Sequence, residues 1–292
     1  MLFGGIEAGG TKFVCAVGDE NGTIQDRAEF PTRTPKETME DVEAFFSRFK
    51  IKAIGIASFG PIDVNPDSKT YGYITTTPKT VWQHYPLKQV VEKALGVPVG
   101  FTTDVNGAAL GEQMLGAAKG LDSCLYITVG TGIGAGAIVK GKVLEGLSHP
   151  EMGHVLVRRH PEDHYEGACP FHKDCLEGLA AGPAIEARWG QKGKELAGRP
   201  EVWEMEADYL AQALMQYILV VSPKKIVMGG GVMHQKQLFP LIHKKLAAFI
   251  NGYVQLPEPL SEYITAPGLG NDAGITGAIL LGKQAYEKRL IL

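Results

Sequence analysis

The sequence has few cysteines and no long apolar run. Four cysteines in 292 residues are too few for a disulfide framework. No apolar stretch approaches the roughly 20 residues that span a bilayer. The first residues, from Leu2 to Ile6, lack the charged region, apolar core and cleavage site of a signal peptide. These absences predict a cytoplasmic protein with no membrane partner.

Dense basic stretches are also missing. The 29 Lys and Arg residues nearly balance the 32 Asp and Glu residues, which leaves a formal charge of −3. This balance, without a basic cluster, argues against a nucleic-acid partner. Hydrophobic residues make up 45% of the chain, enough for a full core, and the length fits two lobes better than one.

A short pattern occurs twice, starting at Ile6 and again at Ile127. Each copy reads as an apolar strand, a glycine turn and a second apolar strand. Glycine turns let backbone N–H groups approach an anion. Two such loops facing each other could hold a polyphosphate, although a chance likeness of two hairpins is the alternative.

The elements around the two copies follow the same order. Each copy continues into a third strand, and helices then alternate with strands. This repetition predicts two α/β lobes around a cleft, with residues 1–120 in the first and residues 121–292 in the second. The ranges expected for strands are 23–30, 51–57, 97–103, 125–129, 133–139, 225–228 and 263–266, and those for helices are 34–50, 86–95, 201–221, 232–250 and 272–288.

Asp104 follows an apolar strand and precedes a helical segment. A carboxylate at such a strand end faces the cleft of an α/β fold. It can accept the proton of a substrate hydroxyl and orient the oxygen for attack on a phosphate. The alternative is an aspartate that only caps the helix.

Several residues are candidates for holding a nucleotide. Backbone donors and threonine hydroxyls of the two glycine turns can bind phosphate oxygens, and a lysine adds a cation. Glu7 could hold Mg²⁺ directly or through water, or be an ordinary polar strand-end residue. A run of three glycines after a late strand is a further place for a nucleotide. The candidates are Gly9, Gly10, Thr11, Lys12, Gly130, Thr131, Gly132, Gly229, Gly230 and Gly231.

Cys169, His172 and Cys175 place three soft ligands in one short loop. Zinc binds such ligands tetrahedrally and needs a fourth. His154 is the first candidate for it, and the alternates are His149, His160 and His164. The competing interpretation is three free surface side chains in a polar loop.

Carboxylates surround the same loop. Glu151 and Glu177 lie near His154 and Cys175 in the sequence. Carboxylates beside an imidazole oriented by a metal form an array of hydrogen-bond acceptors and donors for a polyol. Ordinary surface charges are the alternative for each residue taken alone.

These residues together resemble the ROK family of sugar kinases and repressors along essentially the whole chain. The segment from Glu7 to Lys12 is similar to its first phosphate loop, Asp104 to its catalytic base, and Gly130–Gly134 to its second phosphate loop. The segment from Gly146 to His154 is similar to the family signature, and the cysteine segment to its zinc motif.

The resemblance is closest to the bacterial fructokinase branch. The segments that carry it are Ser58–Asp63, Thr77–Trp82, His149–His154 and Cys169–Leu179. It implies an actin-like ATPase fold (ribonuclease H-like and duplicated), a homodimer, and ATP, Mg²⁺ and Zn²⁺ as cofactors. It also implies a hexose contacted by Gly60, Pro61, Thr103, Asp104, Glu151, His154 and Glu177.

Three departures from the family pattern and one absence refine this expectation. Glu7 stands where family members often have aspartate, which changes its reach but leaves a metal-holding role intact. Thr103 replaces an asparagine that grips a sugar hydroxyl in glucose-type members, and His172 replaces a thiolate of the zinc motif. The first phosphate loop begins near residue 5, which leaves no room before it for the winged helix of the repressor branch.

The function expected from the sequence is ATP-dependent phosphorylation of a hexose, with D-fructose converted to fructose 6-phosphate. One alternative is a kinase with broad specificity for mannose or glucose. The other is a catalytically silent sugar-binding regulator, against which the joint presence of Asp104 and both glycine turns argues.

Overall fold

The structure is a computed structural model that describes residues 1–291. The chain divides into two compact units. The first contains residues 1–120, residues 143–150 and the segment from Gly268 onward, and the second contains residues 121–142 and 151–267. The lobe expected over residues 121–292 therefore loses its C-terminal segment to the first unit.

The first unit is built on a five-stranded mixed sheet with the order β3-β2-β1-β4-β5. Strand β1 runs antiparallel to β2 and parallel to β4, and β4 runs parallel to β5. The strands are β1 (Leu2–Ala8), β2 (Lys12–Asp19), β3 (Ile24–Pro31), β4 (Ile54–Ser58) and β5 (Val99–Thr103).

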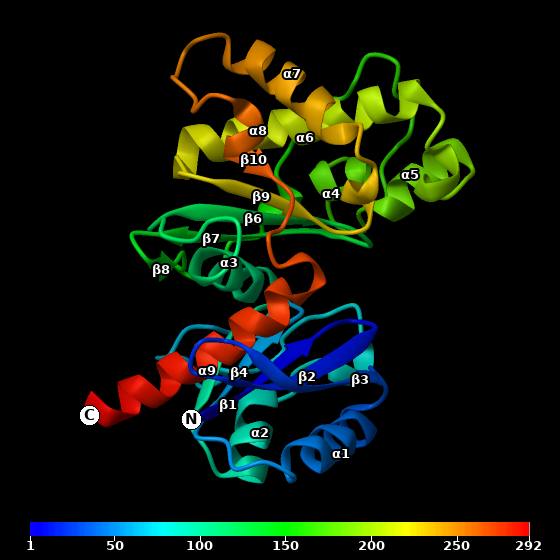
Figure 1. Ribbon diagram of the computed structural model, residues 1–292. Helices are drawn as coiled ribbons and strands as arrows, with labels where there is room; N and C mark the ends of the chain where they lie inside the picture. The colour runs from blue at the N-terminus through cyan, green and yellow to red at the C-terminus, as the bar shows by residue number, and fades with distance from the viewer. Residues whose placement is uncertain (292) are drawn as a thin grey trace. The chain divides into compact units, whose positions relative to one another are not determined.

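Helices cover both faces of this sheet (Figure 1). Helix α1 begins with a capping box between Thr34 and Glu37 and a proline at its first position. The helices are α1 (Pro35–Phe46), η1 (Thr80–Trp82), α2 (Leu87–Leu95), α3 (Asp104–Met114), η5 (Gly270–Asp272) and α9 (Ala273–Ile291).

Strand alternation assigns side chains to two separate cores. Cys15 and Val17 on β2 pack in one core with residues of α1. Val14 and Ala16 point the other way and pack with Ile275 and other residues of α9. Helix α9 therefore covers one face of the first sheet, which explains why the C-terminal segment belongs to the first unit.

The second unit repeats the same strand plan. Its sheet has the order β10-β9-β6-β7-β8, with β6 antiparallel to β7 and parallel to β9. If β6 to β10 are counted as the first to the fifth strand and the sheet is read from its β8 edge, the order is 3-2-1-4-5, as in the first sheet. The repeat seen in the sequence is therefore a repeat of topology. The strands are β6 (Cys124–Val129), β7 (Ile133–Val139), β8 (Lys142–Val143), β9 (Ile226–Gly229) and β10 (Ile264–Thr265).

The helices of the second unit differ in several places from those expected, and α8 is one for which no helix was expected. The helix expected over residues 232–250 is interrupted after His234 and resumes at Leu238. Helices α4 and α5 occupy a segment for which none was expected. The helices are η2 (Met152–His154), α4 (Leu176–Ala180), α5 (Gly182–Trp189), η3 (Gly193–Leu196), α6 (Pro200–Val221), η4 (Val232–His234), α7 (Leu238–Ile250) and α8 (Leu260–Tyr263).

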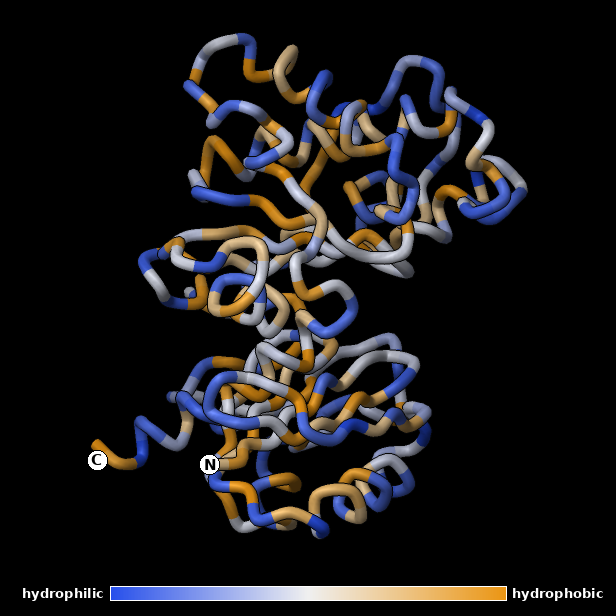
Figure 2. The backbone as a smooth tube through the Cα atoms, in the orientation of Figure 1, coloured by the Kyte–Doolittle hydropathy of each residue, from blue (hydrophilic) through white to orange (hydrophobic). Residues whose placement is uncertain are grey.

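Apolar residues are concentrated in the strands and in the longer helices, and hydrophilic residues are concentrated in the connections (Figure 2). Helix α6 is the longest, and residues such as Tyr209 and Leu214 on it are buried. Within residues 1–291, no helix is both long and apolar enough to cross a membrane.

Candidate active site

Asp104 is the first residue of α3 and comes directly after β5. The residue that caps α3 is Thr103, whose hydroxyl accepts a hydrogen bond from the Asn106 N–H at 3.2 Å. The interpretation of Asp104 as a mere N-cap is therefore wrong. Thr103 is 4% exposed, so it lies beneath the start of the helix, and its hydroxyl is used by the cap.

Glu7 lies close enough to Asp104 for their charges to interact. Burial, and then the Asp104 charge, raise the pKa of Glu7 to about 7. The Glu7 carboxyl rests against Gly274, where a Cβ atom would stand only 2.6 Å from Cδ of Glu7. Two neighbouring carboxylates, one of them poorly solvated, are suited to a divalent cation, which would offset their repulsion.

The turn between β1 and β2 presents backbone donors. It closes through a hydrogen bond from the Gly9 N–H to the Lys12 carbonyl at 3.0 Å. The Thr32 hydroxyl donates to the Gly9 carbonyl at 2.7 Å. Among the described residues, no acceptor receives the N–H groups of Gly10 and Thr11. These donors are available to an anion.

His149 belongs to the first unit and serves the loop at Gly60 and Pro61. Its Nε2 atom accepts the Ile62 N–H at 3.2 Å, and a Cβ on Gly60 would lie 3.6 Å from its Cε1 atom. The ring is 9% exposed. This use of Nε2 removes His149 from the alternates for the metal.

Four side chains of the second unit converge on one point. The ligand atoms of His154, Cys169, His172 and Cys175 all lie within 4.8 Å of one another. The His154 Nδ1 atom is 3.5 Å from the Cys175 sulfur and 3.7 Å from the Cys169 sulfur. These separations match the edges of about 3.6 Å that zinc–sulfur and zinc–nitrogen bond lengths give a tetrahedron. The four residues named in the sequence analysis are thus brought together.

Burial supports a metal at this cluster. Cys169 and Cys175 are buried, so the interpretation as free surface side chains is wrong for them. Burial, together with the neighbouring Cys169, raises the pKa of the Cys175 thiol to about 11. A zinc ion would reverse this effect because it stabilises the thiolates. His160 and His164 do not belong to the cluster found among residues 1–291.

Glu177 lies in the first turn of α4 and contacts the second glycine turn. Its Oε2 atom accepts the Ile133 N–H at 2.9 Å, and a Cβ on Gly132 would stand 2.7 Å from the same oxygen. The turn itself closes from the Gly130 N–H to the Gly132 carbonyl. Glu151 is an exposed residue just before η2. Glu177 therefore supports the second turn as well as lying near the metal cluster.

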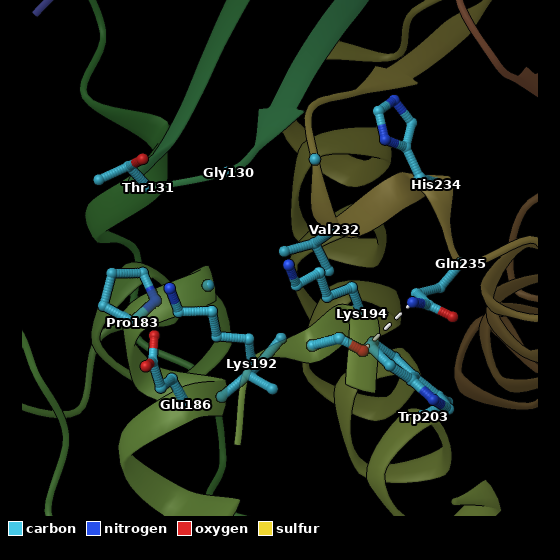
Figure 3. A pocket seen from close by; sticks show the side chains of 14 residues that line it. Gly130, Thr131, Pro183, Glu186, Lys192, Lys194, Trp203, Val232, His234 and Gln235 are labelled. Atoms are coloured by element: carbon cyan, nitrogen blue, oxygen red, sulfur yellow. Dashed lines mark hydrogen bonds between the residues drawn. The ribbon is translucent and has the colours of Figure 1, made fainter. Parts of the chain in front are cut away.

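A cavity of about 500 Å³ lies beside the second turn, a size suited to a small ligand. Figure 3 shows residues around it from the second turn, the stretch from α5 to η3, helix α6 and the stretch after β9. The lining includes Gly130, Thr131 and Gly231 from the sequence-based set. Gly229 and Gly230 do not line the cavity; Gly230, which has φ +93, packs closely on the strand before the second turn, because a Cβ there would meet the Val129 carbonyl at 2.4 Å.

Most of the remaining cavity wall was missed by the sequence analysis. The Gly182 N–H donates to the Gly130 carbonyl at 2.8 Å, which fixes the start of α5 to the second turn. The proline at the first turn of α5 was a signal for this helix start. The residues missed are Gly182, Pro183, Ile185, Glu186, Lys192, Gly193, Lys194, Trp203, Val232, His234 and Gln235.

Two units with one strand plan, each with a glycine turn between its first two strands, define the duplicated ribonuclease H-like architecture of the actin-like ATPases. The chain belongs to the ROK family, whose model matches residues 3–285.

The comparisons with individual proteins agree with the family. The chain is 60% identical to a putative fructokinase of Bacillus subtilis, over 98% of this chain and 97% of that protein. It is 49% identical to a fructokinase of Pediococcus pentosaceus, over 98% and 99% of the two chains. A ROK family glucokinase of Streptomyces griseus, solved with glucose and AMPPNP, has a TM-score of 0.77 at 26% identity, with 97% and 100% covered.

Proposed function

We propose that this protein is an ATP-dependent hexose kinase that converts D-fructose to fructose 6-phosphate. The observation that carries the proposal is its near full-length identity of 60% and 49% to proteins named fructokinase. Asp104 at the start of α3, where it does not serve as the cap, supplies the group that such a reaction needs.

The chemical step assigns a role to each carboxylate of the first unit. Asp104 accepts the proton of the sugar hydroxyl, whose oxygen bonds to the γ-phosphorus while the bond from that phosphorus to the β–γ bridging oxygen breaks. ADP leaves with that electron pair. Glu7 would hold Mg²⁺, directly or through water, and the ion would neutralise charge on the phosphates. Gly10 and Thr11 supply backbone donors to the transferred group, and Gly9 closes the turn that presents them.

The cavity of the second unit is proposed to hold the nucleotide. The backbone N–H groups of Thr131 and Gly132 bind phosphate oxygens, and the walls around Pro183 and Val232 enclose the base. Gly229 and Gly230 permit the close approach of the backbone. The solved relative that binds AMPPNP supports ATP as the donor.

The residues proposed to contact the sugar are Gly60, Pro61, Asp104, Glu151, His154 and Glu177. Zn²⁺ would be held by His154, Cys169, His172 and Cys175, which fit a tetrahedral ion by type and distance. The ion would orient the His154 ring, whose other nitrogen is then available to a sugar hydroxyl.

A coupled assay of ADP release tests the function. The protein is supplied with Mg·ATP and, in separate reactions, fructose, mannose and glucose. We expect fructose to give the highest kcat/KM. A higher value with mannose or glucose would establish the broad-specificity alternative, and no sugar-dependent ADP release would favour the silent regulator.

Location and assembly complete the proposal. We propose a cytoplasmic enzyme, because ATP is its donor and because all four cysteines are free thiols in the part of the chain described. We also propose that it works as a homodimer, as the family resemblance implies.

A further inference from the structure

Lys79 belongs to the Thr77–Trp82 segment, which carries part of the resemblance to fructokinases but has no role so far. Its side chain lies over the first glycine turn. A Cβ atom on Gly10 would stand 3.2 Å from Cε of Lys79, and no other atom of the described residues beyond the chain neighbours of Gly10 comes within 4 Å of that position. The missing side chain of Gly10 therefore makes room for the end of this lysine.

The backbone of Lys79 is held firmly. Its N–H donates to the Thr77 hydroxyl at 3.4 Å, and its carbonyl accepts the Trp82 N–H at 2.8 Å. Thr77 is itself 3% exposed, and its carbonyl accepts the Gln83 side-chain amide at 2.9 Å. The lysine is thus presented from a fixed turn.

The same frame holds the glycine turn. The buried ring of Trp82 packs on Phe13, which follows the turn, with 5.2 Å between ring centroids. Its indole N–H donates to the Arg33 carbonyl at 2.9 Å. The adjacent Thr32 holds both sides of the turn, through the carbonyls of Gly9 and Thr11. The position of Lys79 relative to the turn is therefore set by packing.

Charge distinguishes this lysine from the one expected to serve the turn. The Lys12 ammonium forms an ion pair with Glu29 at 2.6 Å. Among residues 1–291, no carboxylate pairs with the ammonium of Lys79. An unpaired cation beside unpaired backbone N–H groups forms an anion site of stronger field than the turn alone.

The sheet places this anion site beside the proposed base. Ala8 at the end of β1 is in register with Ser58 on β4, and Ser58 is in register with Thr103 on β5. The glycine turn and Asp104 thus leave the same edge of one sheet, two strands apart. A phosphate bound at this turn lies near Asp104, the proposed proton acceptor. Because the transferred phosphate is the one that must reach the sugar hydroxyl beside Asp104, it is the phosphate that this turn would hold.

We propose that Lys79, and not Lys12, binds the phosphoryl group that is transferred. This inference rests on the proposed kinase function. The ammonium stays protonated, donates to an equatorial phosphate oxygen and offsets charge as the group moves from ATP to the sugar; no proton leaves it. Its effect is electrostatic stabilisation of a loose transition state.

The test compares Lys79→Met, Lys79→Arg and Lys12→Met, with Lys36→Met as a matched control. Lys36 is exposed on α1. We expect Lys79→Met to lower kcat/KM for ATP by about 20-fold or more, the scale of a lost hydrogen bond from a charged group. The KM for fructose should stay within about twofold, Lys79→Arg should recover most of the loss, and Lys12→Met should lose less than Lys79→Met.

A second readout does not depend on turnover. Calorimetry with Mg·AMPPNP and with Mg·ADP should show that Lys79→Met weakens binding of the triphosphate analogue about tenfold or more, and binding of the diphosphate much less. Equal weakening of both, or a rise confined to the KM for fructose, would overturn the assignment. If the unmodified protein binds both nucleotides but phosphorylates no sugar, the kinase proposal fails. The ratio of the affinities for Mg·AMPPNP and Mg·ADP, compared between Lys79→Met and the unmodified protein, still tests whether Lys79 contacts the terminal phosphate.

Discussion

At the scale of single residues, Asp104 is the side chain on which the proposed phosphoryl transfer depends. Asparagine has nearly the same shape but cannot accept the hydroxyl proton. We expect Asp104→Asn to fold, to bind fructose with unchanged affinity and to turn over at least about 100-fold more slowly, the usual scale for a lost general base. Steady-state kinetics and fructose titration measure both quantities. Turnover near that of the unmodified protein would remove Asp104 from this role.

Glu206 on α6 shows the opposite case, a carboxyl with no functional partner. It is 2% exposed, and among the described residues neither of its side-chain oxygens has a hydrogen-bond partner. Burial raises its pKa well above the ordinary value of 4.5, and Arg188 offsets this only in part. The folded protein therefore keeps a proton that the unfolded chain releases.

This difference predicts a pH dependence of stability. Below pH 4.5 both states hold the proton, so the ionisation of Glu206 does not affect stability. As the pH rises above 4.5, the unfolded chain releases the proton, and the free energy of unfolding falls until the pH reaches the folded-state pKa, above which it stays constant. Glu206→Gln removes the penalty. We expect its stability advantage in urea unfolding to grow between pH 5 and pH 8 by up to about 1.4 kcal/mol per pH unit. The exposed Glu162→Gln should show no such trend, and a pH-independent difference at Glu206 would contradict the argument.

At the scale of elements, we expect the loop between η2 and α4 to depend on a zinc ion held by its four Cys and His side chains. Metal analysis of protein purified without a chelator should find about one zinc per chain. We expect Cys169→Ser and Cys175→Ser to lower this content and to weaken fructose binding, because His154 loses its orientation. Cys124→Ser, on a buried strand away from the cluster, serves as the control. Full zinc content in both ligand variants would point to other ligands.

Helix α3 is positioned by close contact with α9. A Cβ on Gly277 would lie 1.7 Å from the Gly107 carbonyl oxygen, so the two backbones touch where both residues lack side chains. We expect Gly277→Ala to destabilise the protein by about 2 kcal/mol and to lower kcat, because α3 begins with Asp104. Thermal unfolding and kinetics check this against Gly198→Ala, where nothing lies within 4 Å. An unchanged kcat in a destabilised Gly277→Ala variant would show that the contact between α3 and α9 does not affect catalysis.

At the scale of the whole molecule, we expect the protein to assemble into a homodimer. Sedimentation at micromolar concentration should give a species of twice the chain mass of 31.4 kDa. Large apolar side chains at Leu219 and Val220 are exposed on the second unit, and such groups are often covered in oligomers. A single species at the mass of one chain would contradict the dimer.

Much of the architecture was predictable from local signals. The pattern of two apolar strands around a glycine turn, which starts at Ile6 and again at Ile127, predicted the two hairpins. The helix expected over residues 34–50 corresponds to α1. The spacing of Cys169, His172 and Cys175 predicted their cluster. These signals act over a few residues, so no knowledge of distant contacts is needed to read them.

Local patterns in the amino-acid sequence specify the duplicated strand plan, the glycine turns, the position of Asp104 after a strand and the Cys/His cluster around Cys169. The tertiary structure alone decided that α9 covers one face of the first sheet, that His149 serves Ile62 across 87 residues, that Thr103 is the cap and that Lys79 lies over Gly10. Hydrogen-bond geometry and side-chain periodicity are local properties of the chain. The choice of partner for a buried imidazole, an apolar helix face or a lysine depends on which surfaces pack together, and only the folded chain settles that.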